Sequence, residues 1–288
     1  MPTAGDVLED AEERLKRSRF IEHPHAGKER YDAEELLSHV LGRDPDDDEE
    51  ISPPALRRFH GLLERRASGV PGAYLTGRTE FKEMSLMVGR GAFIPRESSE
   101  DMVDQAARRL RSRRKPVHVD VATGVGPVAL AVARAVPGAT AYGVDIARRA
   151  IELAKANARA LGLRNTWFGC GDLFAPLPAG LRGRVDVITV HPPYVPRGEV
   201  RTLPDEIRLH EPRESLTDSS AGGTGLLTRV AGEAPVWLRP GGWLLVEVSP
   251  DRSRQVATVL RRTGFGDVRS TRGEIAVSRV VVGRLPTR

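Results

Sequence analysis

The sequence contains one cysteine, Cys170, among its 288 residues. No internal disulfide can form, and this scarcity of cysteine is typical of proteins in a reducing cytoplasm. No stretch approaches the roughly 20 apolar residues that a membrane-spanning helix needs. Residues 1–13 are acidic and have no apolar core, so we expect no secretory signal there. We therefore predict a cytoplasmic protein without a membrane partner.

The sequence also lacks a large excess of charge of one sign. The formal net charge is +5, but the 44 basic residues are interspersed with 39 acidic ones. A basic balance permits a nucleic-acid partner. The chain has neither a Lys-rich tail nor an alternation of basic and aromatic residues, so nucleic acid is not expected as a direct substrate.

The N-terminal part of the chain repeats apolar residues at helical spacing. Asp32 is a candidate N-cap and Gly42 a candidate stop of the second of three helices. Glycine and proline at positions 69–72 then break the pattern. We predict a small helical bundle over residues 1–70. Its predicted helices span residues 3–19, 32–41 and 54–67.

Beyond the bundle the apolar pattern changes to a strand-like alternation, which predicts a hairpin linker over residues 71–100. From residue 116 onward, short apolar runs alternate with helical stretches, and this predicts an α/β domain over residues 101–288. Its parallel sheet has helices on both faces. Two final runs, residues 268–271 and 276–282, predict an antiparallel hairpin that closes the sheet. The other predicted strands span residues 117–122, 140–144, 166–170, 185–190 and 243–248, and the predicted helices span residues 127–136, 147–161, 226–237 and 252–263.

A Gly-rich loop, residues 120–126, joins the first strand of this domain to a helix. Gly124 and Gly126 let the backbone turn sharply and approach a ligand closely, at the strand end where ligands of open parallel sheets bind. No Gly-Lys-Ser/Thr sequence is present, which excludes a Walker-type phosphate site. The third glycine of a dinucleotide fingerprint is also missing. A lone Gly-x-Gly is equally compatible with a simple tight turn.

Two acidic residues follow the next two strands. Asp145 can accept two hydrogen bonds from a ribose diol, or it can cap the helix that begins after it. Asp172 can accept from an adenine amine, with Leu173 and Phe174 beside the ring. A nucleoside pocket without a pyrophosphate cradle favours S-adenosylmethionine over NAD as the cofactor. The predicted cofactor-binding residues are Asp120, Ala122, Thr123, Gly124, Gly126, Asp145, Ile146, Gly171, Asp172, Leu173 and His191.

The fourth strand ends at His191, and the sequence Pro192-Pro193-Tyr194 follows it. Prolines cannot donate backbone hydrogen bonds, so this segment leaves the sheet in a rigid extended form with free carbonyls. It suits the binding of a planar amide by its N–H groups, with the nitrogen aimed at a methyl sulfonium, because methyl transfer depends mainly on alignment. We predict catalytic roles for His191, Pro192 and Tyr194. A structural histidine at a strand end is the alternative for His191.

Taken together and in order, the motifs resemble those of the release-factor glutamine methyltransferases, class I enzymes that methylate the side-chain amide of a glutamine. The resemblance covers nearly the whole chain and includes the glycine loop and the Pro-Pro-Tyr segment. Its other matched positions are residues 33–37, 69–77, 80–81, 94–96, Glu100, 211–213, 225–226, 240–242, Glu247 and Arg279.

This resemblance implies a Rossmann-like class I methyltransferase sheet, preceded by a helical bundle that helps to dock a protein partner. It implies S-adenosylmethionine as the cofactor, no metal, and a peptide chain release factor with a Gly-Gly-Gln loop as the partner. Strand end 191–194 would receive the two N–H groups of the substrate amide. The substrate-binding residues expected on this basis are Phe81, Pro95, Arg96, His191, Pro192, Pro193, Tyr194 and Glu211.

The chain departs from the family pattern at His191, where the family usually has asparagine. A neutral imidazole offers one acceptor and one donor, and it can also carry a proton. His191 could accept one N–H of an amide, or it could act as a general base for an acceptor that must lose a proton. Residues 97–99 also differ, with Glu-Ser-Ser where Pro-Glu-Thr is usual. Two alternatives therefore stay open: methylation of an unidentified small-molecule acceptor, and a non-catalytic scaffold that binds the cofactor or RNA.

Overall fold

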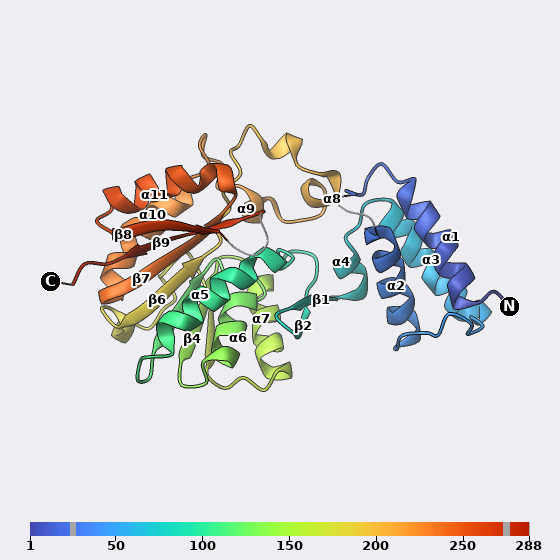
Figure 1. Ribbon diagram of the computed structural model, residues 1–288, viewed down its shortest axis with the longest axis horizontal. Helices are drawn as coiled ribbons and strands as arrows, with labels where there is room; N and C mark the ends of the chain where they lie inside the picture. Colours follow the sequence, from blue (N-terminus) through green and yellow to red (C-terminus); the bar gives the residue numbers. More distant parts are fainter. Residues whose placement is uncertain (24–26, 273–276, 288) are drawn as a thin grey trace. The chain divides into compact units, whose positions relative to one another are not determined.

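The computed structural model describes residues 1–23, 27–272 and 277–287 (Figure 1). The chain divides into two compact units. The smaller comprises Met1–Arg78 with Arg201–Glu211, and the larger comprises Thr79–Val200 with Pro212–Arg288. The chain therefore leaves the larger unit after Val200 and returns to it at Pro212. No periodicity of the sequence indicates this excursion, and the domain boundaries predicted above at residues 70 and 100 stay predictions.

The smaller unit is a helical bundle, as its apolar periodicity predicts. Thr3 begins the first helix with a capping box in which its side chain and that of Asp6 each bond the other's backbone N–H. Gly42, with φ of 75°, ends the second helix as expected. Asp32 is not the N-cap, because that helix begins four residues earlier, after Gly27. The helices are α1 (Ala4–Lys16), α2 (Lys28–Leu41), α3 (Pro53–Ala67), α4 (Gly72–Thr76) and, in the excursion, α8 (Asp205–Arg208).

A buried arginine fastens the excursion to the bundle. Arg66 of α3 is only 1% exposed. Its Nε donates to Asp32 Oδ2 at 2.8 Å and its Nη2 to Glu206 Oε2 at 2.9 Å. Lys28 Nζ lies 3.3 Å from Asp32 and 3.9 Å from Glu206. Two cations therefore neutralise two largely buried carboxylates, one of which belongs to α8.

We expect Arg66→Met to destabilise the smaller unit by ~3 kcal/mol, because it leaves buried carboxylates with too little positive charge. Arg65→Met is the matched control, since Arg65 is exposed on the same helix turn. Hydrogen exchange of the α2 and α3 amides measures the opening free energy of this unit. Equal protection in the two variants would contradict a stabilising role of the buried pair.

The larger unit begins within a hairpin, β1 (Arg78–Phe81) and β2 (Met84–Met87), that forms a sheet of its own. This hairpin is shorter than the predicted linker. Leu75 lies in α4 and Phe93 in an irregular segment, so these apolar positions of the predicted linker are outside its strands. The side chains of Phe81, Met84 and Leu86 are buried in the hydrophobic core.

The main sheet has seven strands in the order β5-β4-β3-β6-β7-β9-β8. β3, β4, β5, β6 and β7 are parallel, while β9 is antiparallel to both β7 and β8. The predicted parallel sheet with a closing antiparallel hairpin is confirmed, although position 276, the predicted start of the last strand, lies outside the described residues. The strands are β3 (Val117–Val121), β4 (Thr140–Asp145), β5 (Thr166–Cys170), β6 (Val185–Val190), β7 (Leu238–Val248), β8 (Gly266–Arg272) and β9 (Arg279–Arg284).

Helices cover both faces of the sheet (Figure 1). Residues of α5, α6 and α7 share one core cluster with Leu245 of β7, and residues of α10 and α11 share another with Leu244. Neighbouring strand residues thus face opposite layers, which is why the strands are apolar throughout rather than alternating. Of the helices of this unit, α5 and the four-residue α9 are absent from the sequence prediction. The helices are α5 (Glu100–Leu110), α6 (Pro127–Ala135), α7 (Arg148–Ala160), α9 (Arg213–Leu216), α10 (Gly225–Trp237) and α11 (Ser253–Arg262).

The strand order reverses between β3 and β6. The chain proceeds outward from β3 through β4 to β5, then returns to β6 on the other side of β3. Val121 and Val190, at the ends of these two strands, are paired. Ligands of open parallel sheets bind at such a point, beyond the carboxyl ends of the strands. The glycine loop and His191 follow these two strands, so the topology brings them to one edge. Within the described ranges, no helix has the length and apolar character to cross a membrane.

Candidate active site

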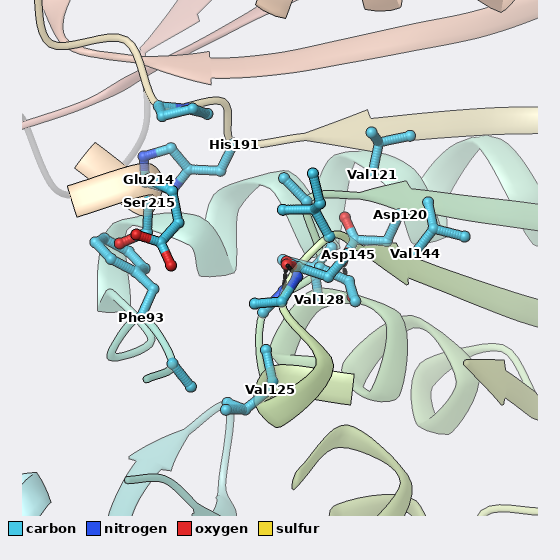
Figure 2. Close-up of a pocket in the computed structure, with 18 of the residues that line it drawn as sticks. Phe93, Asp120, Val121, Val125, Val128, Val144, Asp145, His191, Glu214 and Ser215 are labelled. Carbon is cyan, nitrogen blue, oxygen red and sulfur yellow. Dashed lines mark hydrogen bonds between the residues drawn. The ribbon is translucent and has the colours of Figure 1, made fainter. Parts of the chain in front are cut away.

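A cavity opens at this edge of the sheet. It encloses about 1100 Å³ of space, part of which is open to solvent. Its lining residues come from the loops after β3, β4, β5 and β6, from the segment before α5, and from α9. Figure 2 shows two groups of labelled side chains, with Asp145, Asp120 and Val144 in one and Phe93, His191 and Glu214 in the other. We refer to them as the acidic end and the aromatic end.

The glycine loop is tightly turned. Ala122, Gly124 and Gly126 have φ values of 55°, 57° and 88°, in the left-handed region that favours glycine. A Cβ on Gly126 would lie 3.1 Å from the Phe168 ring, so the loop packs closely on β5 at this point. Ala122, Thr123 and Gly124 line the cavity, whereas Gly126 is not among the described lining residues. Gly126 therefore serves the turn and its packing.

Asp145 ties this loop to the start of α7. Its Oδ2 accepts the N–H of Gly124 and its Oδ1 accepts the N–H of Ala147, each at 2.8 Å. Ala147 is the N-cap residue of α7 and no side chain caps this helix, so Asp145 holds the turn before α7 and is not its N-cap. Each carboxylate oxygen has a second lone pair, so acceptors for a diol remain. The pKa of Asp145 is raised above its ordinary value. Burial is the main cause and the charge of Glu214 adds to it, while the backbone donors act in the opposite direction.

The loop after β5 supplies apolar side chains and an exposed ion pair. Asp172 lines the cavity, and its Oδ2 accepts from Arg229 Nη2 at 2.5 Å. Leu173 and the exposed Ile146 also line it. Phe174 is instead 1% exposed and stacks on a tryptophan of α10, so it belongs to the core.

A chain of buried polar groups lies beneath the glycine loop. Asp120 accepts hydrogen bonds from the hydroxyls of Thr123 and Thr189, both at 2.6 Å. Because the Thr189 hydroxyl donates its hydrogen bond to Asp120, its oxygen accepts from Nε2 of the fully buried His118 at 2.9 Å. Burial raises the pKa of Asp120 to about 7 and lowers the pKa of His118 to about 3. His118 is therefore neutral, and Asp120 exchanges its proton near neutral pH.

This raised pKa predicts a pH-dependent stability. Between its ordinary pKa of 3.8 and the folded value of about 7, Asp120 holds a proton in the folded protein and not in the unfolded chain. The free energy of unfolding therefore falls as the pH rises through this window, by on the order of 4 kcal/mol from this group. Asp120→Asn removes the dependence.

Urea denaturation of the parent and of Asp120→Asn at pH 5 and pH 8 measures this difference. Asp104→Asn, a change at an exposed aspartate, is the control. The parent and the control should lose more stability than Asp120→Asn over this interval. Parallel pH profiles for all three proteins would refute the prediction.

The aromatic end is built around His191. Its ring stacks on Tyr194, with centroids 5.7 Å apart and planes at 13°, and meets Phe93 edge-on at 5.9 Å. The backbone around Tyr194 is held by a bridge to Thr217. A Cβ on Gly223 would lie 2.1 Å from the Tyr194 carbonyl oxygen, so only glycine fits against this segment. The imidazole is thus fixed between two aromatic rings.

The predicted substrate-binding residues are only partly brought together. His191, Pro193, Pro95 and Arg96 line the cavity, and the Arg96 guanidinium lies 4.5 Å from the Phe93 ring centroid. Pro192 and Tyr194 adjoin them in the chain but are not among the described lining residues. Two others lie elsewhere, because Phe81 is buried in the core and Glu211 is buried in the smaller unit.

Glu247, at the end of β7, is the main residue that site prediction omitted. It is fully buried, and its Oε1 accepts from Ser98 Oγ at 2.8 Å. Its Oε2 lies 3.5 Å from His191 Nδ1 and has no hydrogen-bond partner among the described residues. An acidic residue inside the apolar run of β7 was the available signal, since a lone buried glutamate is rare. Phe93 and Glu214 carried no comparable signal.

The comparisons with known proteins first define the class. A family profile described as a methyltransferase domain matches residues 112–248. A solved methyltransferase structure from Pyrococcus furiosus shares the fold, with a TM-score of 0.51 at 12% identity, over 71% of this chain and 90% of that one. The fold and the profile together identify an enzyme of the class I methyltransferases.

The sequence relatives define the family. The profile described as the PrmC N-terminal domain matches residues 6–77. The release factor glutamine methyltransferase of Geobacter sulfurreducens is 35% identical over 261 residues, 89% of this chain and 89% of that protein. Its counterpart in Xylella fastidiosa strain 9a5c is 36% identical over 263 residues, 90% of this chain and 94% of that protein. The chain belongs to the release factor glutamine methyltransferase family, as the order of its motifs predicts.

Proposed function

We propose that the protein transfers the methyl group of S-adenosylmethionine to the side-chain amide nitrogen of a glutamine in a peptide chain release factor. One observation carries the proposal: a single cavity at the strand-order reversal has diol acceptors at its acidic end and a rigid aromatic strand end opposite. Relatives that carry this activity in their name, at about 35% identity over about 90% of the chain, support it.

The residues at the acidic end fit S-adenosylmethionine. Asp145 keeps acceptor capacity for a ribose diol, and Ile146 and Leu173 offer apolar contact to a base. The absence of a phosphate-binding sequence suits a nucleoside better than a dinucleotide. When bound, the cofactor supplies a methyl group on a positively charged sulfur, which a nitrogen lone pair can attack.

At the aromatic end we assign the acceptor amide to the segment 191–194. The carbonyl of Pro192 accepts one N–H of the amide and His191 accepts the other, while Tyr194 and Phe93 confine the amide plane. Fixing the nitrogen in line with the methyl group converts a bimolecular step into one limited by alignment. Pro95, Arg96 and Pro193 complete this end of the cavity.

The remaining parts of the proposal concern the partner and the location. The helical bundle, residues 1–70, contributes to docking of the release factor, and the hairpin, residues 71–100, links it to the methyltransferase domain, residues 101–288. A cytoplasmic location fits the single cysteine. A small-molecule acceptor is the second candidate, favoured by the imidazole of His191 beside a buried carboxylate.

Incubation with S-adenosylmethionine labelled in the methyl group tests the reaction. We expect label on a release factor and none on the same factor with the glutamine of its Gly-Gly-Gln loop changed to alanine. Mass spectrometry of the peptide should show one added methyl group on that glutamine. Label on small molecules alone would favour the second candidate, and binding of the cofactor without any transfer would favour a scaffold.

Cofactor binding has its own test. Asp145→Asn retains one carboxamide oxygen where the parent has two carboxylate oxygens, so it cannot hold both backbone N–H groups and a diol. We expect the affinity for S-adenosylmethionine, measured by calorimetry, to fall roughly 10- to 100-fold. The exposed control Asp104→Asn should bind as the parent does, and an unchanged affinity of Asp145→Asn would remove this residue from the cofactor site.

A further inference from the structure

Glu247 presents an unusual electrostatic situation. Its side chain is fully buried within a sheet of apolar side chains, and one oxygen is satisfied by Ser98. The other oxygen, Oε2, is buried and has no hydrogen bond within the described part of the chain. A buried carboxylate oxygen without a donor is costly, so structures retain one only where something compensates.

His191 Nδ1 is the group poised to compensate. It lies 3.5 Å from Oε2, within ion-pair range but longer than a good hydrogen bond. The Ser99 hydroxyl lies 3.4 Å from the same nitrogen. The stacking on Tyr194 and the edge contact with Phe93 hold the ring in this orientation, so a shift of a few tenths of an ångström completes the bond.

The opposite nitrogen of the ring is available to a ligand. His191 Nε2 has no hydrogen-bond partner among the described residues and is not one of the buried unsatisfied atoms. The side chain is 21% exposed, and the residue lines the cavity. The imidazole therefore bridges a buried carboxylate on one side and the cavity on the other.

We propose that Glu247 is a positioning residue that holds His191 as the Nδ1–H tautomer, so that Nε2 accepts the proton released in methyl transfer. The tautomer of a histidine is set by the hydrogen bond that its other nitrogen makes. This inference rests on the proposed function for the identity of the acceptor, and it gives the imidazole a role that an asparagine cannot fill.

The proton balance of the reaction explains what the pair contributes. As the bond from the amide nitrogen to the methyl carbon forms, the bond from that carbon to sulfur breaks and its electron pair stays on sulfur. The nitrogen then has four bonds and a positive charge, so it must lose a proton. Nε2 takes it, and the resulting imidazolium is stabilised by the charge of Glu247. The partly exposed ring then releases the proton to solvent.

A spectroscopic measurement tests the tautomer without any substrate. In protein labelled with ¹⁵N-histidine, imidazole nitrogen shifts distinguish a protonated nitrogen from a free one, and the spectrum of His191→Asn identifies the His191 signals. We expect Nδ1 protonated and Nε2 free in the parent, and a mixture of tautomers in Glu247→Gln. The same tautomer in both proteins would overturn the proposal. Glu233→Gln, a change on the exposed face of α10, is the matched control.

Kinetics test the catalytic consequence in the full chain. Glu247→Gln should lower kcat for release-factor methylation roughly 10- to 100-fold and raise KM by a smaller factor, because it alters the proton acceptor in the transition state more than the hydrogen bond to the bound amide. In the His191→Asn background the same change should have little further effect, since the two residues act as one unit. Equal losses in both backgrounds would mean that Glu247 has a structural role only.

The two proposals fail in different ways. If the parent labels no release factor, the proposed acceptor is wrong, while the histidine spectra still decide whether Glu247 sets the tautomer. If the parent labels the factor but the tautomer does not depend on Glu247, the acceptor stands and the pair is refuted. Thermal melting and cofactor calorimetry of each variant confirm that a loss of kcat is not a loss of folding.

Discussion

Carboxylates removed from water at the ends of parallel strands organise the site. Asp120, Asp145 and Glu247 each end or nearly end a strand; Asp120 and Glu247 are buried, and Asp145 is half-buried. A shielded carboxylate must find donors, and each finds them in a different way. Asp120 uses two hydroxyls and Asp145 uses two backbone N–H groups. Glu247 accepts from one hydroxyl at Oε1, and its Oε2 has no hydrogen-bond donor among the described residues. These hydrogen bonds help to hold the loops in place. Every donor except the core hydroxyl of Thr189 belongs to a residue that lines the cavity or to the neighbour of one.

Elements that are marked by a pattern of consecutive residues could be predicted from the sequence. The strands of the main sheet are uninterrupted apolar runs between turn residues, and the predicted bounds of β5 and β6 are those observed. Helix α5 could not be recognised in the same way, because acidic residues, a glutamine and two arginines interrupt its apolar positions and no side chain caps its start. The excursion at residues 201–211 has no periodicity, since its place is fixed by the ion pairs of Arg66 and not by an apolar face.

The same distinction applies to the residues of the candidate site. Glycines after a strand, followed by acids at the next strand ends, form a pattern that the chain order alone reveals, and Gly124 and Asp145 do meet as that pattern predicts. Phe81 was expected at the substrate site by resemblance alone, and it lies in the core, because the sequence does not distinguish an aromatic residue that faces a cavity from one that is packed inside. Glu247 and Ser98 are 149 residues apart, so their contact follows from strand order and not from spacing. Contacts of this kind can be identified only when the fold is known.

The excursion also changes how a shortened form of this protein should be interpreted. A chain cut before residue 79 would keep Glu206 and lose Arg66 and Lys28, the cations that neutralise it. The freed segment, residues 201–211, begins seven residues after Tyr194 and rejoins the larger unit at Pro212, which lines the cavity. Removing the bundle therefore frees residues 201–211, and both ends of this segment join the larger unit near the proposed reacting groups. An inactive fragment would report this lost anchorage as readily as a lost partner, so a deletion cannot separate the two effects and point substitutions in the bundle can.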